Sequence, residues 1–370
     1  MRVNILTAIV LLSVVLILGG VHPAAAQFYT QTNLVSDGAV PAALVDLNLV
    51  NAWGLVSSPT SPWWISDNGT GKSTLYNVGT GTIPLIVTVP GAGGKQSAPT
   101  GIVFNGNSNS FVVTNSTGTS AARFIFASED GTISGFRGVP VVIAVDNSAS
   151  GAVYKGLAID STTTGKLLYA TNFHAGTVDV FDSHFNPVHI LGAFTDHSLP
   201  AGYAPFGIQA IKIGDQTQIY VTYALQDADK HDDVPGVGHG FINAFDTDGN
   251  LIRRVASKGR LNSPWGLALA PGTPAADFGF FSNDLLVGNF GDGHINAFDP
   301  GQLLGNGEYQ PRGQLHSADG PPIAIDGLWA LAFGSGSAAS GPTNTLFFTA
   351  GPFGEQHGLF GTLVVSPPPD

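Results

Sequence analysis

The chain has no cysteine, a single methionine and few charged residues. Only 11% of its 370 residues are charged, and the formal net charge is −12. The missing cysteine excludes disulfides, thiol catalysis and cysteine metal ligands. The acidic balance, with no cluster of Lys or Arg, argues against a nucleic-acid partner, because phosphate contacts need clustered basic side chains. We therefore expect a fold that is held together by its apolar core.

Glycine and proline are abundant, with 49 Gly and 24 Pro, and a five-residue phrase recurs at intervals of 47 to 64 residues. Its six copies are Asn51-Ala-Trp-Gly-Leu55, Ala98-Pro-Thr-Gly-Ile102, Val153-Tyr-Lys-Gly-Leu157, Ala204-Pro-Phe-Gly-Ile208, Ser263-Pro-Trp-Gly-Leu267 and the altered Gly327-Leu-Trp-Ala-Leu331. A period of about 40 to 50 residues with loop insertions is typical of β-propeller blades.

A second phrase, Gly-x-[Ile/Val]-x-x-Phe-Asp, follows within several of these repeats, for example at Gly176–Asp182, Gly240–Asp246 and Gly293–Asp299. An apolar run stands between the two phrases, so each repeat predicts an antiparallel four-stranded meander. The predicted fold is all-β: a six-bladed β-propeller of four-stranded antiparallel blades. The blades are predicted at 49–90, 97–145, 152–195, 203–257, 262–317 and 325–364. Phe111-Val-Val113 is an extra apolar run inside the second blade.

The two ends of the chain carry separate predictions. Arg2, the apolar stretch from Ile5 to Val21 and Ala24-Ala-Ala26 predict a cleaved signal peptide over 1–26. The propeller domain is predicted over 27–364 and a disordered tail over 365–370. Phe28 to Val35 is expected to pair with the last blade and close the ring, which removes the exposed sheet edges. We expect a secreted or periplasmic monomer with no membrane span after cleavage.

In such a meander, loops between second and third strands share one face with loops that lead into first strands; this is the top face. Seven histidines map to it: His174, His197, His231, His239, His294, His316 and His357. The innermost strand should carry the Trp-Gly-Leu phrase, so Trp53, Trp265 and Trp329 are interpreted as packing residues.

Acidic and amide side chains share the top-face loops with these histidines. His with carboxylate suits zinc or general-base chemistry, and carboxylate with Asn carbonyl suits calcium. The candidate ligand-binding or metal residues are Glu129, Asn172, His174, Asn289, Asp292, His294, Glu355 and His357. No His-Glu-x-x-His spacing is present, and the acidic run Asp227–Asp233 lacks the order of an EF-hand loop, so it is interpreted as a solvated loop.

Phrases such as Leu49-Val-Asn-Ala-Trp-Gly-Leu55 and Leu286-Val-Gly-Asn-Phe-Gly-Asp-Gly293 extend along nearly the whole mature chain. In these phrases the chain resembles an uncharacterised family of secreted bacterial proteins, some of which carry a PEP-CTERM sorting tail. The resemblance implies a six-bladed propeller akin to NHL-repeat proteins and no established activity. The segment Val364 to Asp370 departs from the family, because it has no Pro-Glu-Pro motif, apolar span or basic end.

Three functional hypotheses remain. The first is a secreted binding module for a small molecule, glycan or peptide at the top face. The second is a metal-dependent hydrolase, since similarity to lactonase-like six-bladed propellers implies a divalent ion near the axis. In that case Glu129, Asn172, Asn289 and Asp292 would be the ligands, and calcium or zinc the cofactor. A purely structural role in the cell wall is the third.

Overall fold

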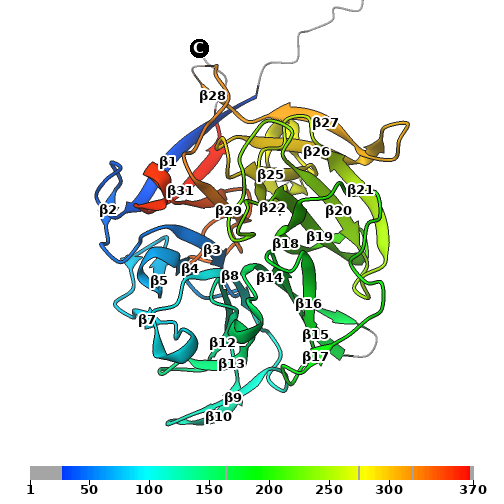
Figure 1. Ribbon diagram of the computed structural model, residues 1–370. Coiled ribbons are helices and arrows are strands. Elements are labelled where there is room, and N and C mark those ends of the chain that lie inside the picture. Colours follow the sequence, from blue (N-terminus) through cyan, green and yellow to red (C-terminus); the bar gives the residue numbers. More distant parts are fainter. Residues whose placement is uncertain (1–26, 163–164, 274–275, 319, 367–370) are drawn as a thin grey trace, which may run out of the picture.

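The computed structural model describes residues 27–162, 165–273, 276–318 and 320–366. The predicted signal peptide, 1–26, lies outside the described residues. Six small, mainly antiparallel sheets are arranged around a centre, with β3, β8, β14, β18, β22 and β29 nearest to it (Figure 1). The prediction of a six-bladed β-propeller is confirmed.

Each blade is a meander whose strands follow the chain from the axis outward. Blade 1 contains β3 (Ala52–Val56), β4 (Trp63–Asp67), β5 (Lys72–Asn77) and, at its edge, β6 (Gly81–Thr82) and β7 (Val87–Thr88). Blade 2 contains β8 (Pro99–Phe104), β11 (Phe124–Ser128), β12 (Thr132–Phe136) and β13 (Val142–Asp146). Blade 3 contains β14 (Tyr154–Thr162), β15 (Gly165–Asn172), β16 (Thr177–Phe181) and β17 (Pro187–Val188).

The second half of the ring repeats this order. Blade 4 contains β18 (Tyr203–Ile213), β19 (Gln216–Leu225), β20 (Phe241–Phe245) and β21 (Leu251–Ser257). Blade 5 contains β22 (Pro264–Leu269), β25 (Leu285–Asn289), β26 (Ile295–Leu303) and β27 (Tyr309–Gln314). Blade 6 contains β29 (Leu328–Phe333), β30 (Leu346–Ala350), β31 (Leu359–Val365) and, from the other end of the chain, β1 (Phe28–Ser36).

The ring is closed by β1, as the sequence predicts. Its antiparallel register with β31 runs from the pair Tyr29 and Val365 to the pair Ser36 and Leu359, and the blue and red strands lie side by side in Figure 1. The Ser366 amide donates to the Phe28 carbonyl at 2.8 Å. The folded part of the chain therefore extends through Ser366, two residues past the predicted boundary at 364.

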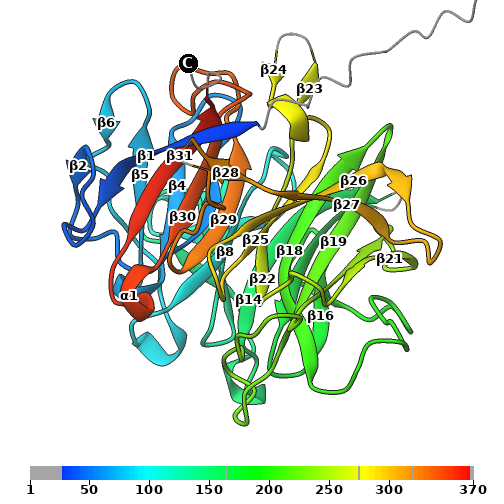
Figure 2. The same cartoon turned by 90° about the horizontal axis from the view of Figure 1, so that it is seen from above.

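Short hairpins, strands and helical turns extend from the ring of blades (Figure 2). The extra apolar run of blade 2 leads into an inserted hairpin, β9 (Val112–Asn115) and β10 (Gly118–Ala121), and blade 5 carries β23 (Gly272–Thr273) and β24 (Ala276–Asp277) at the corresponding place. The strands β2 (Leu44–Val45) and β28 (His316–Ser317) flank β1. The helical turns are η1 (Asn68–Thr70), η2 (Ala92–Gly94), η3 (Ser148–Ser150), η4 (Gly279–Phe281) and α1 (Pro352–Glu355). None of the helices within the described ranges has the length and apolarity to cross a lipid bilayer.

Neighbouring inner strands approach each other closely at the repeated glycine. A Cβ atom on Gly101 would lie 2.3 Å from the Leu157 nitrogen, and one on Gly207 would lie 2.2 Å from the Trp265 carbonyl oxygen. Both distances are shorter than any van der Waals contact. The glycine of the Trp-Gly-Leu phrase is therefore required because it leaves room for the next blade at the axis.

We expect Gly207→Ala to lower the free energy of unfolding by about 2 kcal/mol or more, because the added methyl group must push two blades apart. The control is Gly305→Ala, where no atom lies within 4 Å of the added Cβ and φ is not positive. Urea denaturation of both variants measures the difference, and the control should stay within about 0.5 kcal/mol of the wild type. Equal stability of the two variants would contradict this account of the repeat.

Candidate functional site

The residue before the repeated glycine, or before Ala330 in the sixth copy, holds the same position near the start of each inner strand. These six residues are Trp53, Thr100, Lys155, Phe206, Trp265 and Trp329. The rings of Trp53 and Trp329 are stacked with centroids 3.5 Å apart, and Trp265 packs edge-on against both, at 6.0 and 5.8 Å. All three tryptophans are at most 8% exposed. They are packing residues, as predicted, and they form an apolar floor on the axis.

Lys155 is the one charged residue in this ring of six. Its ammonium group lies 5.2 Å from the ring centroid of Trp53, donates a hydrogen bond to Glu129 Oε1, and donates another to Asp232 Oδ1 at 3.0 Å. Only 2% of its side chain is exposed. Burial by itself lowers the pKa of Lys155, but the carboxylates of Glu129 and Asp232 outweigh burial and raise it. Lys155 is therefore a buried cation and not a neutral base or nucleophile.

Two asparagines extend this polar cluster across the axis. Asn51 Nδ2 donates to Glu355 Oε2 at 2.7 Å and to Asn68 Oδ1 at 3.2 Å, and Asn68 Nδ2 donates to Glu129 Oε2 at 2.9 Å. Asn51 Oδ1 accepts a hydrogen bond from the Trp329 indole at 3.0 Å. The result is one continuous network, called the axial cluster: Asn51, Asn68, Glu129, Lys155, Asp232 and Glu355.

The carboxyl groups of this region differ in their tendency to ionise. Burial raises the pKa of Glu355, and the nearby charge of Glu129 raises it further, although Asn51 donates to it. Burial also raises the pKa of Asp233. Burial acts in the same direction on Asp232, but the Lys155 ammonium outweighs it and lowers the pKa of that carboxyl. The end of the axis therefore combines one strongly held anion with two acids that resist ionisation.

Three residues near the axis have a backbone conformation that L-residues seldom adopt. The φ angles are +48° at Asn51, +46° at Ser263 and +67° at Glu355. Such left-handed conformations cost of order 1–3 kcal/mol each and cluster at functional sites. Two of these residues, Asn51 and Glu355, are hydrogen-bonded to each other within the axial cluster.

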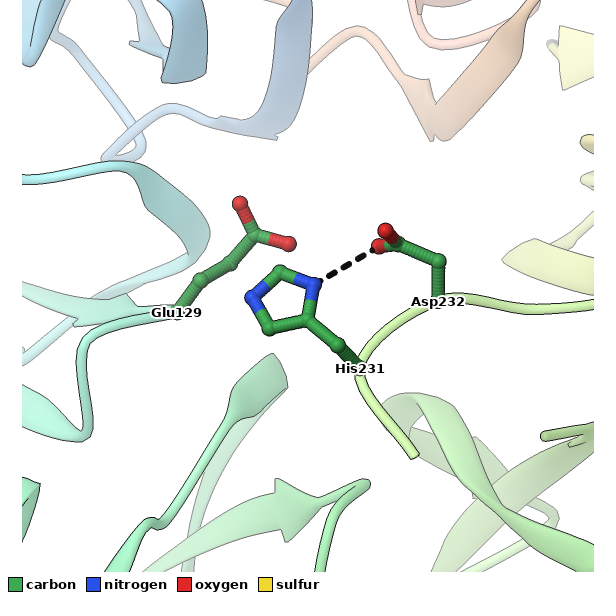
Figure 3. Close-up of side chains that lie close together, drawn as sticks. All are labelled: Glu129, His231 and Asp232. Atoms are coloured by element: carbon green, nitrogen blue, oxygen red, sulfur yellow. Dashed lines mark hydrogen bonds and ion pairs between the residues drawn. The ribbon is translucent and has the colours of Figure 1, made fainter. Parts of the chain in front are cut away.

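His231 joins Glu129 and Asp232 on the outer side of the axial cluster (Figure 3). One ligand atom from each of the three lies within 4.8 Å of the others, the one such group among the described residues. His231 Nδ1 is 3.0 Å from Asp232 Oδ1, and both side chains are about half exposed or more. Glu129 follows β11, whereas His231 and Asp232 stand on the long loop 226–240 after β19. The set could hold a divalent ion, but Lys155 already binds both carboxylates.

The predicted candidates fall into separate groups. Glu129 and Glu355 belong to the axial cluster. Asn289, Asp292 and His294 form their own group in blade 5, where Asn289 Nδ2 donates to Asp292 Oδ1 at 3.0 Å and His294 Nδ1 lies 3.2 Å from the same oxygen.

Asn172 and His174 stand apart from the axial cluster, and His357 meets it through its backbone carbonyl, which accepts from the Asn51 amide at 2.9 Å. Asn172 Nδ2 donates to Asp179 Oδ2 at 3.0 Å inside blade 3. His174 is exposed, and His357 Nδ1 lies 2.6 Å from Asp37 Oδ2 in blade 6. No hydrogen bond joins His174, His294 and His357 to one another within the described residues.

Sequence reasoning missed Lys155, His231 and Asp232. One signal for Lys155 was present: in the aligned repeats it stands where three other copies have tryptophan. His231 and Asp232 belong to the acidic run that was interpreted as a solvated loop. Gln226 Nε2 donates to the Phe173 carbonyl at 2.6 Å, which holds the base of loop 226–240 against blade 3. Gly236 N also donates to Asn262 Oδ1 at 2.6 Å, and Lys155 binds Asp232, so tertiary contacts bring the run toward the axis.

Some buried polar atoms at this end of the propeller have no hydrogen-bond partner among the described residues. They are Trp53 Nε1 and Asn289 Oδ1, whereas the carboxyl of Asp233 and the hydroxyl of Ser263 lie close enough to interact with each other. A buried polar group without a partner costs about 1–3 kcal/mol, so each one requires an explanation such as a bound molecule or an ordered water.

The fold defines the chain as a six-bladed β-propeller, and sequence comparison gives its family. The chain belongs to the family of the uncharacterised proteins R648 and L690 of Acanthamoeba polyphaga mimivirus. It is 34% identical to R648 over 342 residues, which cover 89% of this chain and 78% of the relative. The identity to L690 is 33% over 315 residues, which cover 81% of this chain and 77% of the relative. No model of a known protein family matches the chain.

Solved structures support the fold. A structural genomics protein of unknown function from Bacteroides thetaiotaomicron aligns with a TM-score of 0.51 at 11% identity, over 92% of this chain and 76% of that one. A virginiamycin B lyase from Staphylococcus aureus aligns at 13% identity over 91% of this chain and 100% of that one, with a TM-score of only 0.47. At 11% identity the likeness to the Bacteroides protein shows the fold and nothing of the chemistry.

The opposite pKa directions of Glu355 and Asp232 predict opposite pH effects. The raised pKa of Glu355 destabilises the folded state as pH rises above its ordinary value of 4.5, so the stability of Glu355→Gln relative to the wild type should increase as pH rises from that value. The lowered pKa of Asp232 stabilises the folded state above pH 3.8, the ordinary pKa of an aspartate. Asp232→Asn should therefore lose stability relative to the wild type as pH rises toward 3.8 from below. Urea denaturation across pH tests both; the same sign for both variants would refute the assignment.

Proposed function

We propose that this chain is an exported binding module whose ligand docks at the axial end of the top face, over Glu129, Asp232 and Glu355. One observation carries the proposal: a continuous polar network rests on a buried tryptophan floor and leaves buried polar atoms without partners among the described residues. Propellers commonly bind ligands at the mouth of the central axis, and such sites combine an apolar base with a few fixed polar groups.

The charges of the axial cluster favour a ligand with a positive group. Glu129, Asp232 and Glu355, with Asp233 beside them, give four acids against the single ammonium of Lys155. Lys155 is held inside, whereas 64% of the Asp232 side chain remains exposed. A ligand that brings an amino or guanidino group would form charge-assisted hydrogen bonds with this carboxylate. It would also relieve the repulsion from Glu129, which adds to the effect of burial on the pKa of Glu355. We infer that the ligand is a basic peptide or another small amine.

A metal-dependent hydrolase is the second candidate, because Glu129, His231 and Asp232 offer three ligand atoms within 4.8 Å. The group fits calcium or zinc in its donor types. Against this candidate, the Lys155 ammonium is already paired with two of the three donors, and a metal ion would have to compete with it for Glu129 and Asp232. We therefore place the hydrolase second.

Export of the protein and its membership of a family of secreted bacterial proteins are proposals. The predicted signal peptide falls on residues outside the described ranges, and the relatives found are viral proteins. Mass determination of the N-terminus of the protein recovered from culture medium or periplasm tests export.

Peptide and small-amine arrays probed with the chain 27–370 should give binders that carry Lys, Arg or free amino groups. We expect Asp232→Asn to weaken binding of the best such peptide about tenfold, because one charge-assisted contact is lost. The control is Asp248→Asn, which removes an equally exposed carboxylate in the turn between β20 and β21, outside the top face. Equal loss in both variants would mean that net charge, and not the axial site, attracts the peptide.

Elemental analysis of the purified protein separates the two candidates. We expect no stoichiometric calcium or zinc and the same melting temperature with and without EDTA, because Lys155 supplies the axial positive charge. A stoichiometric ion whose removal lowers the melting temperature, and which is lost in His231→Ala, would instead support the hydrolase, since a ligand bound to the folded state alone stabilises it by mass action.

A further inference from the structure

A cavity lies on the outer part of blade 5, apart from the axial cluster. It has a volume of about 440 Å³ and is bounded by residues 256–261, which lead from blade 4 into blade 5, and by the outer strands β26 and β27. Its lining includes Asn296 of β26, Lys258 and Arg260 of the connecting loop, and Glu308 before β27. The volume is within the range of small-molecule sites.

Blade 4 has an amide at the same place in the repeat. Asn243 in Phe-Ile-Asn-Ala-Phe matches Asn296 in His-Ile-Asn-Ala-Phe. In blade 4 both halves of the amide are used: Asn243 Nδ2 donates to Asp196 Oδ2 at 3.0 Å, and Asn243 Oδ1 accepts from Arg254 Nε at 2.6 Å. Asp196 comes from the segment leading into blade 4, and Arg254 stands opposite Asn243 in β21.

Blade 5 lacks both of these partners. Asn296 is 2% exposed, and neither its Oδ1 nor its Nδ2 has a hydrogen-bond partner within the described residues. Gln314 stands opposite Asn296 in β27, where blade 4 has Arg254, and no hydrogen bond joins the two. Asn296 contributes to the lining of the cavity, whereas Asn243 in blade 4 is covered by the Asp196–Arg254 pair. A donor and an acceptor are therefore left for a guest molecule.

The guest must meet two chemical conditions. It must offer an acceptor to Asn296 Nδ2 and a donor to Asn296 Oδ1, which a carboxylate alone cannot do because it only accepts. Adjacent hydroxyl groups of a sugar meet this condition. The second condition is a negative charge on the guest, because Lys258 and Arg260 are exposed at the rim. Neither has an ion-pair partner within the described part of this acidic chain. Glu308 is the one acid of the lining, and it accepts from Ser257 Oγ at 2.5 Å.

We propose that this cavity binds a uronic acid residue. Two neighbouring hydroxyl groups pair with the Asn296 amide, and the carboxylate lies toward Lys258 and Arg260. The site is independent of the axial cluster and does not rest on the function proposed above.

Saturation-transfer NMR with the chain 27–370 tests this site, with glucuronate and galacturonate as probes. We expect one of them to bind, and glucose and acetate to bind at least about tenfold more weakly, because each lacks one of the two recognised groups. Asn296→Leu should remove uronate binding without lowering the melting temperature, since it deletes an amide that has no partner. Lys258→Gln with Arg260→Gln should weaken uronate binding and leave glucose unchanged.

Asn243→Leu is the matched control in blade 4. It should leave uronate binding intact and lower the melting temperature, because Asp196 and Arg254 each lose a hydrogen bond to the Asn243 amide. If Asn243→Leu fails to fold, the double variant of Lys258 and Arg260 still tests whether this cavity binds the uronate, since both positions are exposed. No transfer from either uronate, or equal binding by the wild type and Asn296→Leu, would overturn the proposal.

Discussion

The close approach of six inner strands at the axis is the constraint on which the rest of the molecule depends. At Gly101 and Gly207 the next blade is nearer than a Cβ atom would allow. Because the strands crowd at this point, five of the six residues at the position before the glycine each contact at least one of the others around the axis. The choice of those six residues therefore decides whether the axis is a channel, an apolar plug or a polar site. Three tryptophans and a phenylalanine plug it, and a lysine changes its chemistry.

Lys155 converts a packing position into an electrostatic one. A buried ammonium is stable only with anions in contact, so Glu129 and Asp232 become structural requirements as well as features of the site. Glu129 is nearly buried, whereas Asp232 is exposed and stands on a long loop. The lysine thus has one fixed partner and one partner that solvent or a ligand can reach. This asymmetry gives the axial cluster a face that can respond to binding.

The fold was predictable because its signals are local and repeated. The phrase around Trp53 and the one around Phe298 each fix a strand, and six copies fix the ring. The site was not predictable, because the axial cluster joins residues from blades 1, 2, 3, 4 and 6 through side-chain geometry. Glu129 and Glu355 were found from loop position alone, whereas His174, His294 and His357 share a face but stand in different blades. Asp232 was set aside, since nothing in its own segment shows that loop 226–240 reaches the axis.

Comparing blades with each other gives information that comparison with distant propellers does not. Asn243 and Asn296 occupy the same repeat position, so their different surroundings isolate what each blade adds: an ion pair in blade 4 and a cavity in blade 5. The same logic distinguishes Lys155 from Trp53 and Trp265 on the axis. Because a propeller holds its own aligned copies in one frame, a departure from the repeat marks a position where packing alone does not set the residue. In this chain there are two such departures: Lys155 brings charged partners to the axis, and Asn296 is left with an amide that has no partner among the described residues.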